Sequence, residues 1–144
     1  MKKRIGDPWM PAAEYGRSLP AFMANLLVRD IQRSVDFYAN VLEATVLYSD
    51  PDFAALRVAE AELMLHADHT YDGHAWHDRL TGNEPRGLGA ELRLFGVDPD
   101  GVATRARAAG ATIIMSATTK AHGWRETMVE DPDGYLWAIG VATS

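Results

Sequence analysis

The sequence predicts an α+β protein built from two copies of a βαβββ unit. Short stretches of alternating apolar residues, typical of strands, recur along the chain. Each half also contains one amphipathic helix that follows an aspartate, at Asp30 and at Asp98. The order of these elements is the same in both halves. One such unit is too small to bury its sheet alone, so we expect the two to close against each other.

The first module is expected over residues 21–67, after an irregular N-terminal arm at 1–20 that shows no helical or strand period. A strand at 22–28 leads to Asp30, and an apolar stripe then recurs at helical spacing. Three short strands are predicted to follow, at 44–48, 53–58 and 62–66. The arm contains Trp9, Met10, Tyr15 and Leu19, which are too apolar for a purely solvated tail. We therefore expect it to pack on the body or on a partner subunit.

The second module is expected over residues 90–142, after a linker at 68–89 that contains three histidines. A strand at 90–97 precedes Asp98-Pro99, which is an N-cap followed by a proline at the first helical position. Strands are predicted at 112–116, 125–130 and 135–141. The linker histidines are interpreted as polar loop residues, with one short helical turn at 74–80.

Composition limits the functional classes. The chain has 144 residues, which fits one domain, and 47% of them are hydrophobic. It has no cysteine, which excludes disulfides, thiolate metal ligands and a cysteine nucleophile. No apolar run approaches the roughly 20 residues that span a membrane. The net charge of −6 disfavours nucleic acid as a partner and mildly favours cationic or neutral ligands. A cytoplasmic location is the default expectation.

The most specific pattern lies near the C-terminus. Asp131-Pro132-Asp133-Gly134 is a tight-turn sequence, and Gly123-x-Arg125 stands upstream of it. The turn is flanked by short stretches rich in aromatic and β-branched residues, which predicts a hairpin. The whole pattern resembles the last hairpin of the vicinal oxygen chelate superfamily. That superfamily includes glyoxalase I, bleomycin-resistance proteins, fosfomycin-modifying enzymes and extradiol dioxygenases.

This resemblance implies a single domain at residues 21–142. In the family, two βαβββ modules form a cupped, eight-stranded mixed sheet around a cleft, which a second subunit often completes. A homodimer is therefore expected. One departure is local, because the usual glycine after the first helix is Glu43 here. We expect Glu43 to adopt the chain-reversing conformation itself, or the helix to end differently.

The resemblance also implies where the metal of the family's metal enzymes would bind. The four ligand positions fall on Met23, on Met64 or His66, on Glu91 or Leu92, and on Ala138. Thioethers, one carboxylate and a methyl group do not match the nitrogen and oxygen ligands of Mg, Mn, Fe or Zn. No metal and no other cofactor is therefore predicted.

The candidate site residues come from strands that should face the cleft. His66 ends a strand on the Met64 face, and Glu91 alternates with apolar residues. Either is a candidate catalytic base. The alternatives are a strand-end histidine with a structural hydrogen bond, and a Glu91–Arg93 or Glu91–Arg125 ion pair. Tyr135 and Trp76 are further candidates for an aromatic wall. The predicted ligand-binding residues are Met23, Asn25, Met64, His66, Glu91, Arg93, Trp124 and Trp137.

The leading hypothesis is a metal-free protein that binds a small molecule, similar to bleomycin-resistance proteins that sequester a drug in a dimer cleft. An aromatic or cationic metabolite would suit the same cleft. The competing hypothesis is a lyase, isomerase or dioxygenase acting on a small organic substrate. It would use Glu91 or His66 as a base, or relocated metal ligands. A third hypothesis is a scaffold or interaction module.

Overall fold

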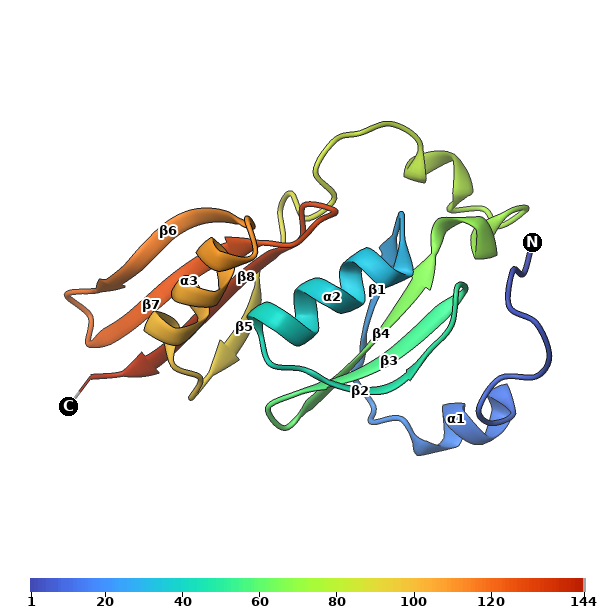
Figure 1. Cartoon of the computed structure of the whole chain (residues 1–144), viewed down its shortest axis with the longest axis horizontal. Helices are drawn as coiled ribbons and strands as arrows, with labels where there is room; N and C mark the ends of the chain where they lie inside the picture. The colour runs from blue at the N-terminus through green and yellow to red at the C-terminus, as the bar shows by residue number, and fades with distance from the viewer. Residues whose placement is uncertain (144) are drawn as a thin grey trace. The chain divides into compact units, whose positions relative to one another are not determined.

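The computed structural model describes residues 1–143 and forms two compact units (Figure 1). Unit 1 comprises Met1–Val35 and Thr45–Thr81, and unit 2 comprises Asp36–Ala44 and the chain from Gly82 onward. Each unit contains one four-stranded mixed sheet. The predicted α+β class and the repeated βαβββ order are therefore confirmed. No helix in the described chain is long and apolar enough to cross a membrane.

Apart from α1 (Ala12–Ser18), the helices and strands follow one another in the predicted order. The first half of the chain contains α1, β1 (Ala24–Val28), α2 (Ile31–Val41), β2 (Thr45–Ser49), β3 (Phe53–Val58), β4 (Ala61–Ala67) and the short 3₁₀ helices η1 (Asp68–Tyr71) and η2 (His77–Leu80). All of these belong to unit 1 except α2, which begins in unit 1 and ends in unit 2. The remainder of unit 2 contains β5 (Leu92–Phe95), α3 (Pro99–Ala108), β6 (Thr112–Thr119), β7 (Trp124–Glu130) and β8 (Leu136–Ala142).

The sheet of unit 1 has two chemically different faces. Its strand order is β1-β4-β3-β2, with β1 parallel to β4 and the other pairs antiparallel. Ala54 pairs with Leu65, and Leu56 pairs with Leu63. All four side chains are buried, so they form the core face. Side chains alternate along a strand, which places the intervening residues of β3 and β4 on the opposite face.

Unit 2 repeats this topology with the order β5-β8-β7-β6, again with the first pair parallel. Asp98 caps α3 as predicted, since its carboxylate accepts the backbone N–H groups of Asp100 and Gly101. Val102, Ala103 and Ala106 are buried. The small-residue face of α3 therefore belongs to the core of unit 2.

The predicted turn at Asp131–Gly134 is confirmed and is held by a buried side chain. Oδ1 of Asp131 accepts the N–H groups of Asp133 and Tyr135, each at 2.9 Å. The Tyr38 hydroxyl donates to Oδ2 at 2.5 Å, and Nε1 of Trp137 donates to that hydroxyl at 3.1 Å. The turn is thus fixed to the core of unit 2 by a chain of hydrogen bonds.

Three local features extend or correct the sequence-based expectations. Glu43 has a φ of 54°, so it adopts the chain-reversing conformation expected of it. The N-terminal arm, expected to be irregular, contains the helix α1. Phe22, expected at the start of the first strand, precedes β1 and is exposed.

Candidate functional site

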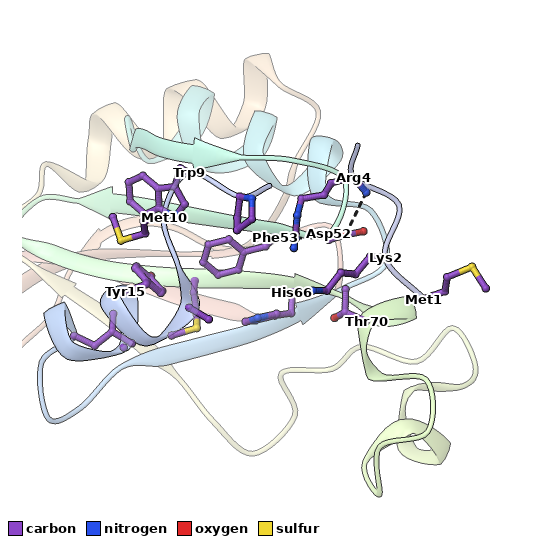
Figure 2. A pocket seen from close by; sticks show the side chains of 15 residues that line it. Met1, Lys2, Arg4, Trp9, Met10, Tyr15, Asp52, Phe53, His66 and Thr70 are labelled. Atoms are coloured by element: carbon purple, nitrogen blue, oxygen red, sulfur yellow. Dashed lines mark hydrogen bonds and ion pairs between the residues drawn. The ribbon is translucent and has the colours of Figure 1, made fainter. Parts of the chain in front are cut away.

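The N-terminal arm and one face of the unit 1 sheet enclose a cavity of about 580 Å³ (Figure 2). We call this cavity the arm pocket. The sheet side is the non-core face, because Phe53 pairs with His66 and alternates with the buried Ala54. The residues that line the pocket are Met1, Lys2, Arg4, Pro8, Trp9, Met10, Ala12, Tyr15, Gly16, Leu19, Asp52, Phe53, Met64, His66 and Thr70.

Aromatic contacts hold the arm over the sheet. The Trp9 ring stacks on Tyr48, with centroids 5.4 Å apart. Tyr15 of α1 meets Phe53 edge-on at 5.5 Å. Offset and edge-to-face pairs of this kind each contribute about 0.5–1.5 kcal/mol beyond their buried area. These contacts keep α1 on the sheet, although none of its own residues is buried.

Asp52 in the β2–β3 turn fixes the other end of the arm. Its Oδ1 accepts the N–H of Lys3 at 2.7 Å, and its Oδ2 accepts the N–H of Arg4 at 3.2 Å. Nε2 of His69 donates to Oδ1 at 2.6 Å. Burial opposes ionisation of this carboxyl, which is only 2% exposed, but the hydrogen bonds from His69, Lys3 and Arg4 outweigh it and lower the pKa of Asp52. The arm is therefore anchored by a charged acceptor.

His66 is the polar group at the sheet side of the pocket, and its tautomer follows from its neighbours. In the structure, Nδ2 of Asn25 donates to the Tyr71 hydroxyl at 3.1 Å. With the amide in this orientation, Oδ1 of Asn25 lies 2.7 Å from Nδ1 of His66 and accepts the hydrogen bond of an Nδ1–H tautomer. Burial lowers the pKa of the imidazole, which is therefore neutral at pH 7.

The second ring nitrogen of His66 then has a lone pair. Nε2 has no hydrogen-bond partner among residues 1–143. A neutral imidazole with its Nδ1–H already bound offers Nε2 as an acceptor or a base. The pocket therefore combines largely apolar walls with a fixed acceptor at His66.

The predicted site residues in unit 1 lie in or near the arm pocket, with one exception. Met64 and His66 line it, and Asn25 orients His66. Met23 precedes β1 and does not line it. Sequence reasoning missed the contributions of Lys2, Arg4 and Phe53. The apolar residues of the arm indicated that it packs on another surface, but they did not indicate which strands form that surface.

Of the predicted site residues in unit 2, Glu91, Arg93 and Trp124 form a partly exposed cluster, whereas Trp137 is buried. Nε of Arg93 lies 2.5 Å from Oε1 of Glu91, and its Nη1 lies 3.2 Å from Oε2 of Glu126. The Arg93 guanidinium also lies 5.1 Å from the centre of the Trp124 ring. The Glu91–Arg93 ion pair weighed from sequence is therefore present. Trp137 is only 4% exposed, and its Nε1 is bound to Tyr38, which places it in the core.

The positions that the resemblance gives to metal ligands include Met23, Met64 and Ala138, whose side chains have no nitrogen or oxygen atom to bind Mg, Mn, Fe or Zn. No group of three or more His, Asp or Glu side chains within residues 1–143 is arranged to hold a metal ion.

The family model of the glyoxalase/bleomycin resistance protein/dioxygenase superfamily matches residues 20–139. An uncharacterized protein of Mycobacterium bovis is 30% identical over 129 residues, which cover 84% of this chain and 82% of that protein.

Solved structures with lower sequence identity share the fold. A family enzyme from Burkholderia phytofirmans superposes with a TM-score of 0.69 at 19% identity, covering 83% of this chain and 96% of that one. A glyoxalase-related enzyme from Fulvimarina pelagi gives 0.67 at 19% identity, covering 85% and 87%. At these identities the likeness concerns the fold, and activity must be argued from the site itself.

Proposed function

Because the chain belongs to the glyoxalase/bleomycin resistance protein/dioxygenase superfamily, we propose that it binds a small organic molecule in the arm pocket of unit 1. The observation that carries this proposal is the cavity of about 580 Å³ that ends at the neutral imidazole of His66. Ligand pockets of about 300–1,000 Å³ with apolar walls and a few fixed polar groups are typical of small-molecule sites.

The wall residues favour a flat ligand. Trp9, Tyr15 and Phe53 contribute aromatic rings, and Met10 and Met64 contribute flexible, polarisable thioethers. Aromatic ligands stack on such rings, and methionine adapts to their outline. Sequestration of such a molecule, as in the bleomycin-resistance branch that the sequence resembles, is the specific form of the proposal.

A pocket-filling variant of α1 tests this proposal. Gly16 lines the cavity, and no atom lies within 4 Å of the position of an added Cβ. Gly16→Trp should fill the pocket without disturbing the fold and abolish binding of aromatic compounds found in a thermal-shift panel. Ala13→Trp is the matched control, since Ala13 lies on the same helix, is exposed and does not line the cavity. If both variants bind every compound as the native protein does, the ligand site lies elsewhere.

A second candidate function is an enzyme with His66 as its general base. The unprotonated Nε2 of His66 lines the pocket, whereas Glu91 is partly exposed and paired with Arg93. An accessible imidazole that is neutral can remove a proton from a bound substrate. His66→Gln should then retain ligand binding and lose turnover. Under the binding proposal, no turnover of any bound compound is detected in the native protein.

We also propose that the protein is a homodimer. Phe95 on β5 and Ile114 on β6 are 54% and 51% exposed, and both lie on edge strands of the unit 2 sheet. Exposed apolar side chains on open sheet edges are commonly covered by a partner chain. Light scattering at micromolar concentration should give twice the mass of 15.8 kDa. A monomer mass would contradict the proposal.

A further inference from the structure

We propose that the arm pocket binds a hydroxyaromatic anion: an aromatic ligand whose hydroxyl donates to Nε2 of His66 and whose anionic group pairs with Lys2. This inference rests on the proposed binding function and names its ligand class. It follows from the charges and hydrogen-bonding groups that line the pocket. These groups favour an anionic ligand, whereas the net charge of −6 favours a cationic or neutral one. At physiological salt the Debye length is about 8 Å, and exposed charges farther away than this are largely screened. The charged groups that line the pocket therefore decide which ligand charge it prefers.

Among the described residues that line the pocket, Asp52 is the one with a carboxylate, and it is not available to a cationic ligand. Both oxygens of Asp52 already accept hydrogen bonds, from the N–H groups of Lys3 and Arg4 and from His69. Its side chain is 2% exposed. A bound cation would have to displace these donors, which would leave their part-buried N–H groups without acceptors.

The two basic side chains that line the pocket within residues 1–143, those of Lys2 and Arg4, differ in availability. The Arg4 guanidinium lies 3.7 Å from Asp50 and 3.7 Å from Asp52, so its charge is offset within the protein. Lys2 has no ion pair or hydrogen bond among residues 1–143. Its side chain points into the pocket in Figure 2. An uncompensated ammonium beside an apolar cavity selects an anionic group on the ligand.

His66 sets the second requirement. Its Nδ1 is hydrogen-bonded to Asn25, which also donates to Tyr71, so the ring cannot turn without losing its hydrogen bond to Asn25. The ring therefore presents Nε2 as an acceptor. A bare carboxylate would face this lone pair unfavourably, whereas a phenolic O–H would donate to it. The aromatic rings of Phe53 and Tyr15 suit the ring that carries such a hydroxyl.

Calorimetry with four matched naphthalene probes tests the inference on protein with any purification tag at the C-terminus. The probes are 6-hydroxy-2-naphthoate, its 6-methoxy analogue, its 2-carboxamide and its 2-aminomethyl analogue. The methoxy analogue should bind about three- to tenfold more weakly, as expected for one lost hydrogen bond. The carboxamide should bind about two- to fivefold more weakly at low salt, the range for an exposed ion pair. The cationic analogue should bind the most weakly.

Two variants test which residue causes each difference in affinity between probes. Lys2→Met should remove the difference between naphthoate and carboxamide, and the matched control Lys3→Met should not, since Lys3 does not line the arm pocket. His66→Phe should remove the difference between hydroxyl and methoxy probes. Lys2 is exposed, so Lys2→Met remains a valid test even if His66→Phe is unstable.

The outcomes separate the inference from the binding function. Equal affinity for all four probes, with binding lost in Gly16→Trp, would overturn the inference and leave the binding function in place. Probe differences that persist in Lys2→Met and His66→Phe would also overturn it. Absence of binding by any probe at millimolar concentration would overturn both.

Discussion

Replacement of Gly134 by alanine should lower the free energy of unfolding by roughly 3–5 kcal/mol. Gly134 has a φ of 92°, a conformation that costs other residues about 1–3 kcal/mol. An added Cβ would lie 2.5 Å from Cα of Pro85 and 2.9 Å from N of Arg86. Because these are backbone atoms, the chain itself must move, and overpacking of this kind adds about 1–3 kcal/mol. Chemical denaturation measures the loss.

Gly89→Ala separates the two causes. Gly89 has a φ of 88°, but no atom lies within 4 Å of its added Cβ. This control should show only the backbone component of about 1–3 kcal/mol. Equal losses in both variants would mean that the contact between the turn and residues 85–86 is not tight.

The stability of unit 2 should fall as the pH rises from about 4 to about 7, because of Asp131. Burial raises the pKa of this carboxyl from 3.8 to about 6. A group with a raised pKa in the folded state contributes stability that is complete below its unfolded value and is lost as the pH rises through the folded value. One pKa unit corresponds to about 1.4 kcal/mol, so a shift of about two units amounts to about 3 kcal/mol.

Asp131→Asn should remove this part of the pH dependence. The asparagine also changes the hydrogen bond with Tyr38, but that change is a constant offset and leaves the slope informative. Asp52→Asn is the control, since the pKa of Asp52 is lowered and its contribution is lost only below pH 4. Urea denaturation at several pH values measures the slopes. An unchanged slope between pH 4 and 7 in Asp131→Asn would assign the dependence to another group.

The sequence predicted most elements of the fold because their signals are local. Residues 53–58 were predicted as a strand with the bounds that β3 shows, since apolar residues and turn residues mark both ends. The N-caps at Asp30 and Asp98 likewise depend on neighbours within a turn. The helix α1 was missed because its stability is not local. It contains Gly16 and buries no residue of its own, and its Tyr15 packs on the distant Phe53 ring.

The candidate site was less predictable because it depends on contacts between distant segments. Alternation along β4 placed Met64 and His66 on one face, and both line the arm pocket. No sequence pattern links Asp52 to the N–H groups of Lys3 and Arg4. Trp137 was expected near a ligand, but it pairs in register with the buried Val129 and so lies on the core face of β8. That assignment needs the register, which the sequence alone does not specify.

The most direct test of a ligand site under the arm is an NMR spectrum of the methionine methyl groups. The chain has six methionines, of which Met1, Met10 and Met64 line the arm pocket and Met115 and Met128 lie in β6 and β7 of unit 2. With ¹³C-methyl labels assigned by single Met→Leu variants, 6-hydroxy-2-naphthoate should shift the Met10 and Met64 signals and leave Met115 and Met128 unchanged. Shifts at Met115 and Met128 with unmoved Met10 and Met64 would contradict the account.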